Sequence, residues 1–178
     1  MQFSSGRNVR QAAGSSVLVL VATLLFSSAA PAQLSNPYGT PITIEAAKQA
    51  TAAAVAKARE NNWLVAVAVV DPSGNLVHFE KMDGTQNGSS VVAIDKARTS
   101  ALFKRPTKAF QDALAAGGEG LRILRLQNVV PIDGGVPLIV DGRIVGAIGV
   151  SGVTSAQDGM CAQAGASVLK KCSPAIPK

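Results

Sequence analysis

Hydrophobic and polar positions along the chain alternate between a helical spacing and short apolar runs. Residues Glu45 to Glu60 are mostly alanine, lysine, glutamine and valine, and Thr43 is placed to cap them, which predicts a helix. The apolar run from Trp63 to Val70 is short and rich in valine, which favours a buried strand. Leu76 to Met82 follows a turn at residues 71–75, so the two runs predict an antiparallel hairpin.

The second half of the chain begins with two predicted helices. Ser89 or Ser90 caps the first, from Val91 to Phe103, and the second runs from Thr107 to Ala115. Helical spacing places one set of residues of the first helix on a common side: Val91, Ile94, Ala97, Arg98, Ala101 and Leu102.

A second hairpin is indicated by the Asp141-Gly142 dipeptide, because both of its residues tolerate the positive φ of a two-residue turn. The flanking strands are Leu138 to Val140 and Arg143 to Val150, and a last helix is expected from Ser155 to Leu169. Glycine pairs at 117–118 and 134–135 lack the context of a phosphate loop and indicate turns or close backbone approach. This order predicts an α+β domain in which helices cover an antiparallel sheet.

The first 32 residues of the 178-residue chain have the pattern of a signal peptide. Arg7 and Arg10 precede the apolar run Val17 to Phe26, and small residues at 30 and 32 predict cleavage before Gln33. The run is shorter than the roughly 20 residues that span a bilayer, which favours a cleaved signal over an anchor. We therefore expect a periplasmic or secreted protein without a membrane span after cleavage, with a leader at 33–41 and one domain at 42–178.

Charge and cysteine content narrow the picture further. The formal net charge of +6 is mild, and a single Trp and a single Tyr offer few stacking surfaces, so a nucleic-acid partner is not expected. Cys161 and Cys172 are the only cysteines, and in an exported chain such a pair predicts a disulfide rather than two free thiols. Their spacing fits no zinc motif.

Conventional catalytic residues are scarce. The only histidine, His78, lies in a predicted strand, and the chain has no GxSxG turn, which argues against a serine hydrolase. His78 could ligate a metal or haem iron, or could be a polar residue of a strand face. Met82 and Met160 are either soft haem ligands or packing residues.

A basic segment lies between Asp95 and Lys108. Its cations stand at a predicted helix end, beside backbone N–H groups that are free where the next helix starts, and this arrangement favours an anionic ligand such as a carboxylate or the haem propionates. A solvated basic helix face is the alternative interpretation. The cations are Lys96, Arg98, Lys104, Arg105 and Lys108.

The same segment resembles the KAxTAxxFxRPT signature of the GlcG/HbpS-like haem-binding proteins. Five further blocks resemble that family in the same order, over about residues 42–169: VVDPSGNLV from Val69, KMDG from Lys81, GGVP from Gly134, GAIGVSG from Gly146, and QD at Gln157 with the AQAG run from Ala162.

The resemblance implies a profilin- or PAS-like two-layer domain, a homo-oligomer, and haem binding, sensing or breakdown. It also implies that Thr99 contacts the iron. His78, as the only histidine, is the fallback iron ligand. Together with the basic segment, it suggests ligand contacts from a set of residues on or just after one helix: Lys96, Arg98, Thr99, Phe103, Lys104 and Arg105.

Two functions remain open from the sequence. The first is an exported haem- or tetrapyrrole-binding protein with a storage, sensing or haem-degrading and protective role. The second is an accessory enzyme or binding module for a small carboxylate such as a 2-hydroxy acid, since that ligand is also anionic. The sequence leaves open whether any ligand is turned over.

Overall fold

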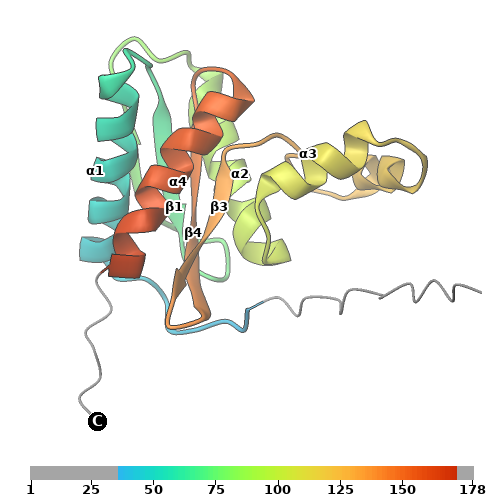
Figure 1. Ribbon diagram of the computed structural model, residues 1–178, viewed down its shortest axis with the longest axis horizontal. Coiled ribbons are helices and arrows are strands. Elements are labelled where there is room, and N and C mark those ends of the chain that lie inside the picture. Colours follow the sequence, from blue (N-terminus) through green and yellow to red (C-terminus); the bar gives the residue numbers. More distant parts are fainter. Residues whose placement is uncertain (1–35, 172–178) are drawn as a thin grey trace, which may run out of the picture. The chain divides into compact units, whose positions relative to one another are not determined.

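The computed structural model describes residues 36–171 of the chain (Figure 1). The predicted signal peptide, its cleavage point and Cys172 lie outside the described residues. Among the described residues, no helix is both long and apolar enough to cross a membrane.

A four-stranded sheet organises the described part of the chain. Its strands are joined in the order β2-β1-β4-β3, and every pairing is antiparallel. At the centre, Val67 of β1 stands opposite Glu80 on one side and Val150 on the other. The strands are β1 (Ala66–Val70), β2 (Leu76–Lys81), β3 (Gly135–Val140) and β4 (Arg143–Ser151). The predicted α+β class and both predicted hairpins are therefore confirmed.

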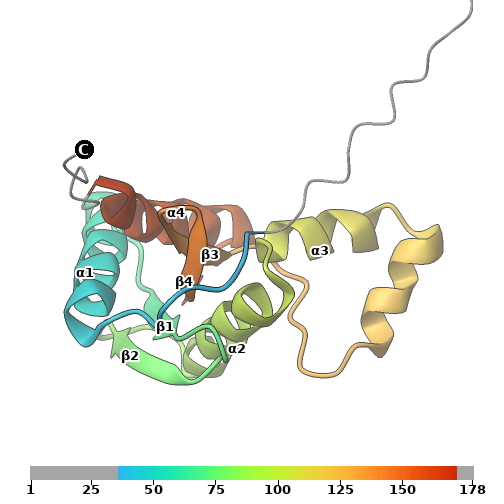
Figure 2. The ribbon, with the colours of Figure 1, turned by 90° about the horizontal axis from the view of Figure 1, so that it is seen from below.

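Helices cover both faces of this sheet (Figure 2). α1 (Ile44–Glu60) and α4 (Ser155–Lys171) pack against each other on one face, where Val67 and Val69 lie in their hydrophobic core. α2 (Gly88–Phe103) covers the other face, where Ala66 and Ala68 meet it. Burial on both faces explains why β1 is apolar without alternation. α2 thus adds a layer to the expected two.

Mainly small residues join α2 to the sheet. A Cβ atom on Gly149 of β4 would lie 2.0 Å from the Ala93 carbonyl oxygen and 2.5 Å from the Ala97 nitrogen. Such close approach of a helix backbone to a strand requires glycine at this position. The helix face predicted from apolar spacing is therefore partly wrong, because Val91 is 61% exposed and Leu102 and Arg98 are also exposed.

Local signals in the sequence set the ends of several elements. The Thr43 hydroxyl accepts a hydrogen bond from the Ala46 backbone N–H, which satisfies one of the free donors at the start of α1. In the turn between β3 and β4, Asp141 and Gly142 have φ angles of 48° and 71°. Both positions therefore need the left-handed backbone that the Asp-Gly pair predicted.

One segment extends away from the sheet and its covering helices (Figure 1). We call residues 107–130 the arm. It contains α3 (Thr107–Ala115) and a 3₁₀ helix, η1 (Gly118–Arg125), followed by a connection toward β3. Only Thr107 and Phe110 of the arm are buried. The sequence predicted α3 but not η1.

The predicted disulfide involves Cys172, which lies outside the described residues. Cys161 is buried and forms no disulfide within the described residues. Because α4 continues to Lys171, about 15 Å separates the Cα atoms of Cys161 and Lys171 at 1.5 Å per residue. Pairing of Cys161 with Cys172 therefore stays a prediction.

Candidate functional site

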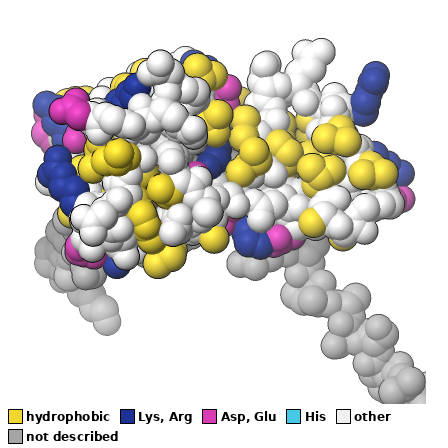
Figure 3. Space-filling view, turned by 90° about the horizontal axis from the view of Figure 1, so that it is seen from above, with side chains coloured by type: hydrophobic (Ala, Val, Ile, Leu, Met, Phe, Trp, Pro, Cys, Tyr) yellow, Lys and Arg dark blue, Asp and Glu magenta, His cyan; other side chains and the backbone are white. Residues whose placement is uncertain are grey.

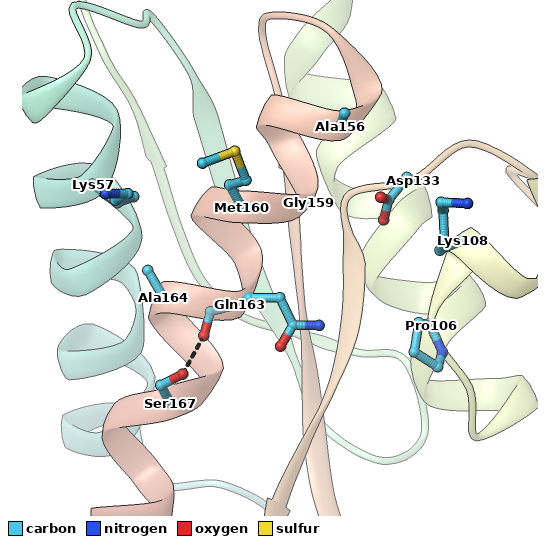
Figure 4. Close-up of a pocket in the computed structure, with 10 residues that line it drawn as sticks. All are labelled: Lys57, Pro106, Lys108, Asp133, Ala156, Gly159, Met160, Gln163, Ala164 and Ser167. Atoms are coloured by element: carbon cyan, nitrogen blue, oxygen red, sulfur yellow. Dashed lines mark hydrogen bonds between the residues drawn. The ribbon is translucent and has the colours of Figure 1, made fainter.

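A groove of about 660 Å³ runs along the outer side of α4 (Figure 4). Its floor is formed by α4 residues spaced three or four apart, which therefore share one helix face. α1, the corner between α2 and α3, and the loop before β3 form its sides. The lining residues are Lys57, Pro106, Lys108, Asp133, Ala156, Gly159, Met160, Gln163, Ala164 and Ser167.

The floor of the groove is low because most of its residues are small. Ala156, Gly159 and Ala164 leave space above α4, and Met160 is the one large apolar side chain that lines the groove. Its side chain is half exposed and lies toward Lys57, while Gln163 extends toward the α2–α3 corner (Figure 4). The groove therefore offers an apolar floor with a polarizable thioether at the surface.

Two lysines stand on opposite sides of this floor. The Lys57 ammonium donates to the Glu60 carboxylate at 3.0 Å, and Lys108 is paired with Asp112. Each pair joins two residues of a single helix at the surface, where such pairs contribute little to stability. Each lysine can therefore exchange its partner for an anionic ligand at small energetic cost.

Asp133 places a carboxylate at the wall of the groove. Its Oδ1 accepts a hydrogen bond of 2.7 Å from the Gly134 N–H, and a Cβ atom on Gly159 would lie 2.6 Å from its Oδ2. Gly159 thus allows the carboxylate to rest directly on α4.

A buried ion pair lies next to the groove floor. The Lys96 ammonium donates to Asp158 Oδ2 at 2.8 Å and to the Val150 carbonyl oxygen at 3.0 Å, while Asp158 Oδ1 accepts from the Val153 N–H. Burial raises the pKa of Asp158, and the hydrogen bond and charge of Lys96 act against that shift. Lys96 is 1% exposed, so its ammonium is committed to the interior and does not face the surface.

The glycine pair at 134–135 passes over this lysine. A Cβ atom on Gly134 would lie 2.8 Å from Lys96 Nζ, and one on Gly135 would lie 2.4 Å from the Lys96 carbonyl oxygen. The Thr107 hydroxyl accepts a hydrogen bond of 2.8 Å from the Gly135 N–H. Close backbone approach, which the sequence suggested for this pair, is confirmed.

Thr99 has a similar positioning role. It is fully buried on α2, and its hydroxyl accepts a hydrogen bond of 3.0 Å from the Val130 N–H. This contact holds the returning end of the arm against α2. Thr99 does not line the groove.

The α2–α3 corner combines aromatic rings with cations. Phe103 and Phe110 meet edge to face at a centroid distance of 5.4 Å, and the Arg105 guanidinium lies 5.4 Å from the Phe110 ring centroid. The Lys104 ammonium stands 4.2 Å from the Tyr38 ring centroid. Cation–π attraction therefore contributes to holding both cations at the corner that borders the groove.

The remaining residues predicted for the site lie elsewhere. Arg98 donates to the Gly74 carbonyl oxygen in the turn between β1 and β2, and it also approaches Asp95. His78 lies on β2, the edge strand opposite β3. No cluster of His, Cys, Asp and Glu that could hold a metal ion occurs within residues 36–171.

The sequence did not indicate the groove, because four segments that are distant along the chain form it. The sequence offers Met160 as a candidate soft ligand, but no sequence signal places Lys57, Asp133 and Gln163 beside it. The repeated small residues on one face of the last helix, at 156, 159 and 164, were the signal that could have indicated a shallow surface there.

Comparisons with known proteins agree on one family. Residues 42–167 match the family model described as "Haem degrading protein HbpS-like". The chain is 39% identical to Protein GlcG of Escherichia coli K12 over 100 residues, which cover 56% of this chain and 73% of GlcG.

Solved structures give the same result. A double mutant of Streptomyces reticuli HbpS superposes with a TM-score of 0.68 at 34% identity, covering 74% of this chain and 88% of that one. The structure described as the PduOC:Heme complex has a TM-score of 0.65 at 29% identity, covering 72% of this chain and 94% of that one. The chain belongs to the GlcG/HbpS-like family.

Proposed function

We propose that this protein binds haem or a related tetrapyrrole and uses the groove beside α4 to do so. The observation that carries the proposal is the combination, in one groove, of an apolar floor, a thioether and two lysines. The family description and the haem complex of a similar structure support the choice of ligand.

The chemistry of the groove fits such a ligand. Haem has a flat apolar ring, two propionates and an iron that accepts thioether and imidazole ligands. Met160 would supply the thioether, while Lys57 and Lys108 would bind the propionates through charge-assisted hydrogen bonds. Bound haem would supply a redox-active iron at this surface.

The residues predicted from the sequence take different parts in this proposal. Arg105 and Phe103, at the neighbouring corner, remain candidates for contact with the edge of the ring, and Lys104 stays a more distant cation. Lys96 supports the floor through Asp158 instead of contacting the ligand. For Thr99 to reach an iron, the Val130 contact would have to open.

We further propose that the protein is exported to the periplasm or the outside of the cell and assembles as a homo-oligomer. A storage, sensing, protective or haem-degrading role is compatible with a half-open groove. The targeting pattern of the first 32 residues supports export, and the family resemblance supports assembly.

Haem titration followed by the Soret band tests the proposal. We expect saturable binding at micromolar haem by the wild type. Met160→Leu should shift the Soret maximum, because it removes the sulfur but keeps the volume. Met82→Leu is the matched control and should leave the band unchanged, because Met82 does not line the groove. Lys57→Gln and Lys108→Gln should each weaken binding several-fold.

Other outcomes would redirect or end the proposal. Loss of the band in His78→Ala or Thr99→Val, with Met160→Leu unaffected, would move the iron contact to that residue. The absence of saturable binding by the wild type would refute the haem proposal. Calorimetry with a small 2-hydroxy acid would then test the carboxylate alternative.

A further inference from the structure

The 3₁₀ helix η1 sorts its side chains into three rows. A 3₁₀ helix has three residues per turn, so residues three apart lie directly above one another. Applied to residues 118–125, this places Leu121 and Leu124 in one row and Gly120 and Ile123 in a second. The third row contains the charged residues Glu119, Arg122 and Arg125.

Only one of these rows packs against α3, the other helix of the arm. A Cβ atom on Gly120 would lie 1.8 Å from the Ala113 carbonyl oxygen, so this row rests directly on α3. Ile123, in the same row, is half-buried. The charged row is exposed, with Glu119 and Arg122 paired at 3.1 Å.

The leucine row faces solvent. Leu121 is 52% exposed and Leu124 is 66% exposed, and Leu126 and Ile132 nearby are also exposed. Figure 3 shows hydrophobic side chains gathered on this projecting part of the molecule. Neighbouring exposed leucines on a segment with little core of its own are typical of an interaction surface.

We propose that the arm pairs with the arm of a second copy of this chain, antiparallel, through the row formed by Leu121 and Leu124. A two-fold axis brings the same apolar row against itself, so one surface satisfies both copies. The same axis places Glu119, at the start of η1, opposite Arg125 of the second copy. The two end charges of the row are therefore self-complementary, while Arg122 lies beside the axis, opposite its own counterpart.

This charge order favours a second copy over a foreign partner. Glu119 is at one end of the charged row and Arg125 at the other, which matches an antiparallel copy without any further component. This leucine row would be a contact surface of the homo-oligomer proposed above. Failure of this inference would leave the haem proposal untouched, because haem titration tests that proposal separately.

The mass of the purified protein, measured by light scattering over a range of concentrations, is the first test. We expect the wild type to exceed the mass of one chain and the double variant Leu121→Glu/Leu124→Glu to associate at least tenfold more weakly. The control Leu64→Glu/Leu76→Glu places two charges at leucines that are also about half exposed, away from the arm. Circular dichroism checks that all variants fold.

Charge reversal tests the pairing itself. Glu119→Arg and Arg125→Glu should each associate more weakly alone, because each repels its own copy. A mixture of the two variants should recover assembly, since both facing end pairs then have opposite charges. A monomeric wild type, unchanged assembly of the leucine variant, or a mixture no stronger than either variant alone would overturn the proposal. Binding of the monomer to lipid vesicles instead would assign the leucine row to a membrane surface.

Discussion

The sheet with its covering helices and the arm use hydrophobic residues in opposite ways. Around the sheet, glycine and alanine bring backbones together, as where Gly149 meets Ala93 and Ala97. In the arm, leucines point outward, and Phe110 is the only buried apolar side chain. The first region has a buried core of its own, whereas the arm has almost none and leaves its leucines exposed. Side-chain size alone thus does not tell which residues form the core.

The largest expected difference between the two regions comes from one added methyl group. Gly149→Ala should cost more than about 4 kcal/mol or prevent folding, because the new Cβ would overlap the α2 backbone. Gly118→Ala in the arm meets no atom within 4 Å and suffers only its positive φ of 55°, at about 1 kcal/mol. Urea unfolding of both variants measures the two costs. Equal costs would contradict the close packing described for α2.

The next effect concerns the buried ion pair. Lys96→Met or Asp158→Asn alone should each cost about 3–5 kcal/mol, because the other partner stays buried without its counter-charge. The double variant Lys96→Met/Asp158→Leu should lose much less free energy of unfolding than the sum of two such single substitutions. Lys57→Met, which breaks an exposed pair, is the control and should change stability by less than about 1 kcal/mol. If Lys57→Met and Lys96→Met lowered the denaturant midpoint by the same amount, a structural role for Lys96 would be contradicted.

A smaller and more local effect is expected where the arm joins the rest of the chain. Phe110→Ala removes the edge-to-face contact with Phe103 and should cost about 3 kcal/mol. Hydrogen exchange should accelerate mainly in α3 and η1, because these elements have few other buried contacts. Leu124→Ala should leave exchange in the sheet unchanged. Faster exchange throughout the sheet in Phe110→Ala would show that the arm and the sheet unfold as one unit.

The smallest effect is on reactivity, not stability. Burial and the negative charge of Asp158 together raise the pKa of Cys161 to about 11, against the opposing charge of Lys57. At pH 8 only roughly one thiol in a thousand is then ionised, so Cys161 should react slowly with disulfide reagents until the protein unfolds. A cysteine introduced at the exposed Ala115 of the arm, in a Cys172→Ser background, should react much faster. Thiol counting on the denatured, unreduced wild type tests the predicted disulfide: the absence of free thiols would confirm it, and two free thiols would refute it.

Much of the fold followed from local signals. Turn chemistry located the Asp141-Gly142 hairpin, the Thr43 cap located the start of α1, and the valine run located β1. These features depend on residues that are close in sequence. The position of α2 on its sheet did not follow, because spacing of large apolar residues selected Val91 and Leu102, whereas the contact uses alanines that face Gly149.

The candidate site was harder to predict because its parts meet only in three dimensions. The basic segment suggested that Lys96 and Thr99 touch a ligand, yet their side chains hold distant backbone segments together. Met160, Lys57 and Lys108 are separated by dozens of residues and converge through the packing of α4 between α1 and the α2–α3 corner. A resemblance of motifs identified the family correctly, but motif residues of this kind can be shared for their structural role alone.

The path of the Lys96 side chain has a consequence for how this sequence can change over time. Its ammonium depends on Asp158 and on the Val150 carbonyl, and its space depends on the absence of a side chain at Gly134. These positions are 38 to 62 residues away from Lys96 along the chain, and each would become unfavourable if the lysine were replaced alone. Across descendants of this sequence, Lys96, Gly134 and Asp158 should therefore be kept or exchanged as a group, and covariation among them would record the ion pair without any structure.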